Sequence, residues 1–238
     1  MSNHFQSEDK LGAIVLQFPQ AADVFKKYGM DFCCGGDRSL AIVADEHHID
    51  QSMLLEELSQ QYDKALQVGL VTKDWMSVSY EQLIQHILNT HHAYLNKVFP
   101  TLTELTVKIL RVHGQHHGAT LSVVHQKYNE LRQGLEAHMI KEEEIVFPQI
   151  IAFEKAQTET KRASIQKMLE ELDREHEATG DILKTIREIT GNYRLPEDAC
   201  NTFAYVYRSL EEMESNIFEH VHLENNVLFL RLSAQTVA

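Results

Sequence analysis

Apolar residues recur at steps of three and four along four long stretches of the chain, the spacing that places side chains on one face of an α-helix. We find no convincing alternation of apolar and polar residues of the kind that a half-buried strand requires. The four stripes are Ile84, Leu88, His92, Leu95, Phe99; Val124, Tyr128, Leu131, Leu135, His138, Glu142, Ile145; Ile165, Leu169, Leu172, His176, Thr179, Leu183, Ile186; and Phe203, Val206, Leu210, Met213, Ile217, His220, Glu224, Val227. This pattern predicts an all-α fold built around a four-helix bundle.

Helix-breaking residues divide the large helical part of the chain into its segments. Proline and glycine mark breaks at Pro100, at 114–118, between 148 and 158, and between 191 and 196. We expect Pro100 to end a helix, because a proline inside a helix removes a backbone hydrogen bond and clashes with the preceding turn.

A smaller helical module precedes the bundle. A helix is expected from Pro19 to Gly29, a second after Asp37 as N-cap, and a third after Asp50 as N-cap. The helical pattern lapses over 68–77, which we interpret as a linker. The expected domains are therefore 1–72, a small cysteine-containing helical domain, and 78–238, the bundle.

Charge and composition narrow the classes of partner. The net charge of −13, with only 22 Lys and Arg, would repel a phosphate backbone, so nucleic acid is not an expected partner. No apolar run approaches the roughly 20 residues that span a bilayer, and the first residues lack the pattern of a signal peptide. We expect a soluble cytoplasmic protein without membrane contact.

Each stripe turns polar for one or two positions before it becomes apolar again. Two stripes contain His-x3-Glu, as His138/Glu142 and His220/Glu224, and each pair lies on one helix face. A carboxylate in an apolar core without a partner costs several kcal/mol, so a positive charge is expected beside it. Two facing motifs, completed by histidines from other helices, predict two metal ions that the glutamates can bridge.

The ligand types indicate which metal these residues would hold. Nitrogen and carboxylate ligands without a thiolate disfavour structural zinc and suit a pair of six-coordinate iron or manganese ions. The chain is richer in histidine than the carboxylate-rich ferritin-like bundles, which points to a hemerythrin-like bundle. Five histidines and two bridging glutamates would leave room for a bridging oxygen and an open position.

His113 can join this site only if the chain reverses. It lies about 31 Å from His92 along an unbroken helix, at 1.5 Å per residue. A break at Pro100 would fold the next segment back, and the run G-Q-H-H-G at 114–118 supplies a turn before His138.

Three cysteines, two of them adjacent, do not form a disulfide framework. Cys33 and Cys34, in D-F-C-C-G-G, precede an expected helix start, where a thiol has a lowered pKa, and are candidate functional residues. Adjacent cysteines close a disulfide only with strain. Cys200 stands alone before a core helix and is expected to be inert.

Over nearly its whole length the chain resembles the iron-sulfur cluster repair di-iron proteins of bacteria. The resemblance is carried by Y-G-M-D-F-C-C-G-G, by H-M-I-K-E-E-E-I-V-F-P and by H-V-H-L-E-N-N-V-L-F, with F-L-R where relatives often have F-P-R. It implies the following metal ligands: His92, His113, His138, Glu142, His176, His220 and Glu224. His113 is supported more by the resemblance than by periodicity.

The resemblance also implies a function. Such a protein restores iron-sulfur clusters damaged by nitrosative or oxidative stress, with iron supplied from a labile centre of two oxo- or carboxylate-bridged irons, and its partners are damaged iron-sulfur proteins. It suggests a homodimer. Alternatives are a protein that binds or reduces nitric oxide, and a hemerythrin-type dioxygen carrier or sensor. Whether the chain is an enzyme is left open.

Overall fold

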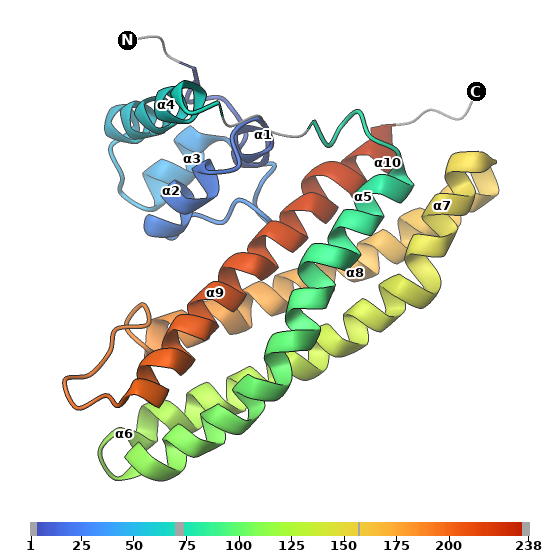
Figure 1. Cartoon of the computed structure of the whole chain (residues 1–238). Helices are drawn as coiled ribbons and strands as arrows, with labels where there is room; N and C mark the ends of the chain where they lie inside the picture. Colours follow the sequence, from blue (N-terminus) through green and yellow to red (C-terminus); the bar gives the residue numbers. More distant parts are fainter. Residues whose placement is uncertain (1–3, 70–73, 157, 235–238) are drawn as a thin grey trace. The chain divides into compact units, whose positions relative to one another are not determined.

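The computed structural model describes residues 4–69, 74–156 and 158–234, and these residues form helices without a β-sheet (Figure 1). Their contacts define two compact units. Of the described residues, 4–69 and 74–79 together with 218–234 belong to one unit, and 80–156 and 158–217 belong to the other. The all-α fold is confirmed. The predicted domain boundary at 72–78 stays a prediction, because the end of the last long helix is grouped with the N-terminal module.

Four helices build the N-terminal module. They are α1 (Leu11–Gln17), α2 (Ala21–Lys27), α3 (Leu40–Glu46) and α4 (Gln51–Gln67). Gly29 follows α2 with a φ of 69°, a left-handed conformation that glycine adopts without steric cost. The side chain of Asp50 accepts a hydrogen bond from the amide of Met53 and caps α4 as predicted.

Two features of the module differ from the sequence prediction. The N-cap of α3 is Ser39, whose side chain accepts from the amide of Ile42, and not Asp37. The helix α1 was not predicted, because it starts after Lys10 without a capping side chain or a proline to mark its beginning. Part of the expected linker, 70–73, lies outside the described residues.

The bundle helices are interrupted by short π-helical turns. In chain order the elements are α5 (Tyr80–Ile87), η1 (Leu88–His92), α6 (Ala93–Lys141), η2 (Glu142–Val146), α7 (Phe147–Lys155), α8 (Glu159–Ile189), α9 (Asn201–Leu223), η3 (Glu224–Phe229) and α10 (Leu230–Ala234).

The element α6 consists of two helical arms that meet at His117, the residue with non-helical backbone angles. The chain turns back there (Figure 1). The hydroxyl of Tyr128 donates to the carbonyl of Phe99 at 2.7 Å, and Thr106 Oγ1 lies 3.0 Å from His125 Nδ1, so the arms run antiparallel. The turn predicted at 114–118 is confirmed.

The predicted break at Pro100 is wrong. Pro100 lies inside the first arm of α6, which continues on both sides of it. A proline in a long helix costs roughly 3 kcal/mol and bends the axis, but packing of the flanking turns can outweigh that cost. Leu95, Phe99 and Leu102 are buried around it.

Most residues of the predicted stripes are buried, but Leu88 and Thr179 are half-buried and Ile145 is exposed. Leu135, His138 and Glu142 are buried as expected, but Ile145 is 49% exposed and Val146 is buried in its place. The π-helical turn η2 begins at Glu142 and contains more residues per turn than an α-helix. The 3.6-residue period therefore fails at this turn.

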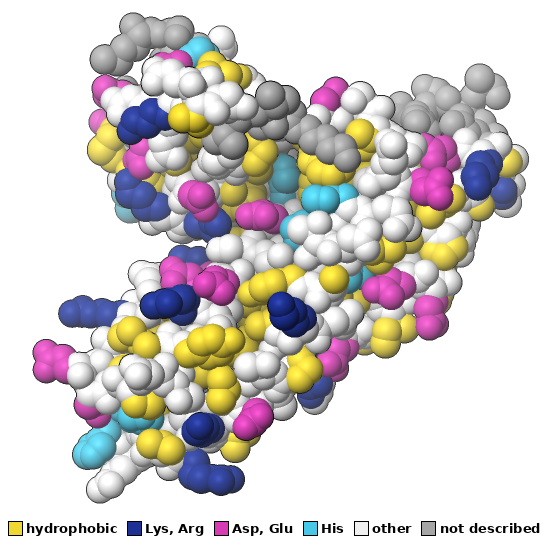
Figure 2. All heavy atoms as spheres, viewed as in Figure 1, with side chains coloured by type: hydrophobic (Ala, Val, Ile, Leu, Met, Phe, Trp, Pro, Cys, Tyr) yellow, Lys and Arg dark blue, Asp and Glu magenta, His cyan; other side chains and the backbone are white. Residues whose placement is uncertain are grey.

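On the face drawn in Figure 2, Lys and Arg side chains are scattered among Asp and Glu side chains. None of the helices formed by the described residues combines the length and the apolar content needed to cross a lipid bilayer.

Candidate metal centre

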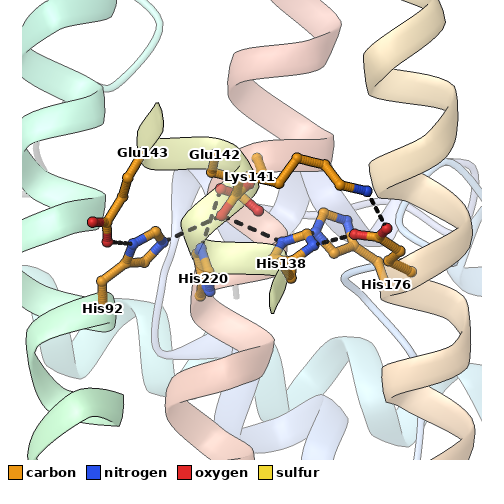
Figure 3. Close-up of polar contacts among 9 residues, drawn as sticks. His92, His138, Lys141, Glu142, Glu143, His176 and His220 are labelled. Atoms are coloured by element: carbon orange, nitrogen blue, oxygen red, sulfur yellow. Dashed lines mark hydrogen bonds and ion pairs between the residues drawn. The ribbon is translucent and has the colours of Figure 1, made fainter. Parts of the chain in front are cut away.

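Three predicted histidine ligands and the carboxylate of Glu142 lie together between the bundle helices. Glu142 Oε2 lies 3.3 Å from His92 Nε2 and 3.3 Å from His138 Nε2. The Nε2 atom of His176, from α8, lies 3.1 Å from that of His138. Figure 3 shows the rings of His92 and His138 directed at Glu142 from opposite sides. All four side chains are buried, and Glu142 is 0% exposed.

The fifth and sixth ligands lie one helical turn apart at the end of α9 and the start of η3. His220 Nε2 and Glu224 Oε1 are 3.1 Å apart, and both side chains are 0% exposed. Ligand atoms of the six residues form two groups of four, within which all atoms lie within 4.8 Å of one another: His92, Glu142, His220, Glu224; and His138, Glu142, His176, Glu224. Both glutamates belong to both groups.

The spacing of these atoms fits metal coordination. Two adjacent ligands of a six-coordinate ion, each bonded at about 2.1 Å, stand about 3.0 Å apart. The separations of 3.1 to 3.3 Å among the histidine nitrogens and glutamate oxygens are close to that value. The clusters therefore constitute a buried His/Glu metal site with nitrogen and carboxylate ligands.

Each of the three π-helical turns contains a ligand at one of its ends. The turn η1 ends at His92, η2 begins at Glu142, and η3 begins at Glu224. Such turns occur frequently at functional sites because they redirect a side chain without ending the helix. A search for the 3.6-residue period does not detect them.

Carboxylates outside the two groups orient two of the histidines. His92 Nδ1 lies 2.7 Å from Glu143 Oε1, and His138 Nδ1 lies 2.8 Å from Glu175 Oε2. The hydrogen bond from His138 lowers the pKa of Glu175 to about 2, so this acceptor is ionised at neutral pH. Because each Nδ1 donates to a carboxylate, each Nε2 presents its lone pair to the site.

His113 does not belong to either group, contrary to the prediction. Its inclusion required a reversal at Pro100, and α6 continues past that residue. His113 instead lies near the turn at His117, where its Nε2 atom is 3.2 Å from the sulfur of Cys200. Its ring also contacts that of Phe203 at 5.2 Å between centroids.

Cys200, expected to be inert, is an exposed thiol with a histidine partner. The hydrogen bond with His113, with smaller contributions from backbone amides at the start of α9, lowers the pKa of Cys200 to about 7. The sequence gives no local sign of this pair, because the two residues lie 87 positions apart.

We expect Cys200 to be the most rapidly alkylated cysteine at pH 7. A thiol with a pKa of about 7 is about half ionised there, against about 1% for a pKa of 9. A low pKa also reduces intrinsic nucleophilicity, so replacing His113 with alanine should slow alkylation about fivefold. The measurement is the rate of iodoacetamide labelling of each cysteine, followed by mass spectrometry.

His117→Ala is the matched control, because His117 is on the same turn but hydrogen-bonds to Asp198 at 2.7 Å. Labelling of Cys200 should keep the wild-type rate in this variant. Equal rates in wild-type protein and the His113→Ala variant would show that the contact has no influence on the thiol.

The thiols of the N-terminal module also differ from expectation. The helix α3 begins at Leu40, so Cys33 and Cys34 are not at its N-terminus. Cys33 is buried, and its neighbour Cys34, burial itself and the charge of Asp31 raise the pKa of Cys33 well above its ordinary value. The predicted lowering of this pKa is wrong.

Comparison with protein families assigns both parts of the chain. Residues 7–62 match ScdA_N, a domain of unknown function (DUF542), and residues 83–232 match the hemerythrin HHE cation binding domain. The second match contains all six ligands of the two buried groups.

Proteins similar over nearly the full length carry a common description. The iron-sulfur cluster repair protein ScdA of Staphylococcus epidermidis is 36% identical, over 95% of this chain and 98% of its own length. The iron-sulfur cluster repair protein YtfE of Citrobacter koseri is 32% identical, over 95% of this chain and 97% of its own length.

Proposed function

This chain belongs to the family of iron-sulfur cluster repair proteins that join an ScdA_N domain to a hemerythrin domain, and on that premise we propose that it is a di-iron protein that repairs damaged clusters. Two iron ions would occupy the two buried groups. His92 and His220 would bind one ion, and His138 and His176 would bind the other. Glu142 and Glu224 would bridge them.

The observation that carries this proposal is the sharing of two fully buried glutamates by both ligand groups. A buried carboxylate requires a cation or a strong hydrogen-bond partner, and two carboxylates shared by two groups suit a pair of cations. Histidine and carboxylate ligands without sulfur favour iron or manganese over a closed zinc site.

The ligand count supports release of iron rather than permanent storage. With His113 excluded, each ion would receive two imidazole nitrogens and one oxygen from each glutamate. Four protein ligands leave two of six positions for water, a bridging oxygen or an exchanging ligand. When bound, the metal pair supplies exchangeable iron and positions at which a small molecule can bind. The protein holds the histidines in orientation through Glu143 and Glu175.

We propose damaged iron-sulfur proteins as the partners that receive this iron. The name shared by the similar proteins supports this choice. The same open positions admit nitric oxide or dioxygen, so binding or reduction of nitric oxide is the second candidate function. We rank this function below repair because the chain carries the N-terminal module with its two thiols, which a gas carrier does not need. The homodimer and the cytoplasmic location stay predictions.

Iron transfer tests the proposal directly. Protein purified without oxygen is loaded with 57Fe2+ and mixed with an oxidatively damaged [4Fe-4S] enzyme and dithionite, which supplies the electron that the rebuilt cluster needs, and the label in the re-isolated enzyme is measured together with its activity. We expect 57Fe to enter the damaged cluster and activity to return. A protein that keeps its iron, leaves the enzyme inactive and binds dioxygen reversibly would be a carrier instead.

A further inference from the structure

The cysteine loop, residues 31–36, gathers three potential ligands outside the His/Glu groups. Asp31 Oδ1 accepts hydrogen bonds from the amides of Cys33 and Cys34, each at 3.0 Å. The Cys33 sulfur lies 3.2 Å from this oxygen and 3.9 Å from the Cys34 sulfur. Ligand atoms of the three residues all lie within 4.8 Å of one another.

The separation of the two sulfurs fits a shared cation better than a covalent bond. Two thiolates bonded to one tetrahedral ion at about 2.3 Å stand roughly 3.8 Å apart. A disulfide requires about 2.05 Å. The observed 3.9 Å agrees with the first value, and both cysteines are free.

The three groups also share one electrostatic requirement. Two thiolates and one carboxylate would place three negative charges within a few ångströms, which repel strongly without a cation between them. A divalent ion bound among them removes that repulsion and favours ionisation of both thiols. Sulfur ligands select borderline ions such as Fe2+ or Zn2+ over Mg2+ and Ca2+. Access from solvent is available, since Asp31 is exposed and Cys34 is half-buried.

Asn226, in η3, hydrogen-bonds this loop to the π-helical turn that begins with Glu224. Its side-chain amide donates to the carbonyl of Cys33 at 2.9 Å and to that of Phe32 at 3.4 Å. A Cβ at Gly36 would lie 2.4 Å from Asn226 Oδ1, so glycine is required where the backbone approaches this side chain.

Aromatic contacts hold the same loop in place. The ring of Phe32 lies 6.0 Å from that of Phe218 and 6.0 Å from that of His222, measured between centroids. Both partners are on α9, within six residues of Glu224 in the sequence. The thiols are therefore held by the chain segment that also carries a ligand of the buried site.

We propose that Asp31, Cys33 and Cys34 form a second cation site, which binds one borderline divalent ion through two thiolates and a carboxylate. Binding releases the two thiol protons to solvent and leaves the oxidation state of the ion unchanged. Three protein ligands leave one tetrahedral position open, which suits an ion in transit. The site itself does not depend on the proposed function. Only the identification of the ion as iron that moves to or from the buried site rests on that function.

Cobalt titration tests the site, because Co2+ bound to thiolate has a near-ultraviolet charge-transfer absorption that histidine and carboxylate ligands do not produce. The full chain, with its His/Glu site loaded with iron, is titrated without oxygen. We expect this absorption to saturate at one Co2+ per chain. It should be lost in Cys34→Ser and should persist in Cys200→Ser, the control that removes the exposed thiol.

Two further measurements distinguish loss of the cation site from misfolding of a variant. The Cys34→Ser variant should keep its iron content and helical circular dichroism, and Asn226→Ala should bind Co2+ about tenfold more weakly with iron content unchanged. Absence of the absorption in wild-type protein, or its persistence in Cys34→Ser, would overturn the proposal. A positive titration with failed 57Fe transfer would reject the repair function and leave the thiolate site standing.

Discussion

Replacing Glu142 with glutamine is expected to remove metal from both positions of the buried site. Glu142 Oε2 lies 3.3 Å from a histidine of each ligand group, and the residue belongs to both groups. An amide is a weak neutral ligand, so loss of the carboxylate removes a bond and a compensating negative charge at each position. Since even loss of an outer hydrogen-bond partner lowers metal affinity 10- to 100-fold, we expect a loss of more than about 100-fold. Iron per chain, measured by mass spectrometry, should fall from about two to near zero.

Two comparison variants make this result specific. Glu144→Gln changes an exposed carboxylate in the same π-helical turn and should keep its iron. His176→Ala removes a ligand that belongs to only one group, and should lose about one ion. If Glu142→Gln and His176→Ala lose the same single ion, Glu142 does not bridge two metals.

Replacing Arg187 with alanine is expected to destabilise the bundle by about 3–5 kcal/mol, because it leaves a buried carboxylate without its cation. Arg187 Nε donates to Glu214 Oε1 at 3.0 Å, a second nitrogen of the guanidinium contacts the other oxygen, and Glu214 is 1% exposed. For a chain of this length, that loss corresponds to a fall in Tm of about 10 °C. Thermal unfolding of the metal-loaded protein measures it.

The pH dependence identifies the cause. Burial raises the pKa of Glu214 above its ordinary value, and Arg187 partly offsets this rise. Without Arg187 the folded-state pKa rises further, so the folded protein binds a proton that the unfolded chain releases. The loss of unfolding free energy in Arg187→Ala should be largest above the raised pKa of Glu214. It should shrink as the pH falls toward about 4.3, the ordinary pKa of a glutamate. The double variant Arg187→Met, Glu214→Met should recover most of the stability. A deficit that does not change with pH would point to lost packing instead.

Much of the buried site could be predicted because its ligands repeat a local pattern. His138/Glu142 and His220/Glu224 are separated by four residues on apolar stripes, and a buried carboxylate in such a stripe requires a partner. His92 and His176 occupy equivalent positions in the other two stripes. The structure brings these six residues together. The seventh, His113, rests on the family resemblance together with an assumed bend at Pro100 and not on a stripe, and it lies outside both groups.

The remaining features depend on contacts between residues distant in sequence. The Cys200–His113 pair forms because the chain turns at His117, and the contact of Asn226 with Cys33 joins residues 193 positions apart. Helix propensity depends only on residues that are close in sequence, so it predicts neither contact. The position of Cys34 relative to α3 could not be predicted, because the residues between Cys34 and the N-cap Ser39 show no helical period.

The π-helical turns have a consequence for how the chain can change over evolution. Each adds a residue to a helix and rotates every later side chain by roughly 100°, which is why Val146 rather than Ile145 faces inward. Deleting one residue from 142–146 would restore a regular helix but turn the buried residues of α7 toward solvent. Insertions and deletions at these turns should therefore be rejected as strongly as loss of a ligand, although the turns look like ordinary helix in the sequence.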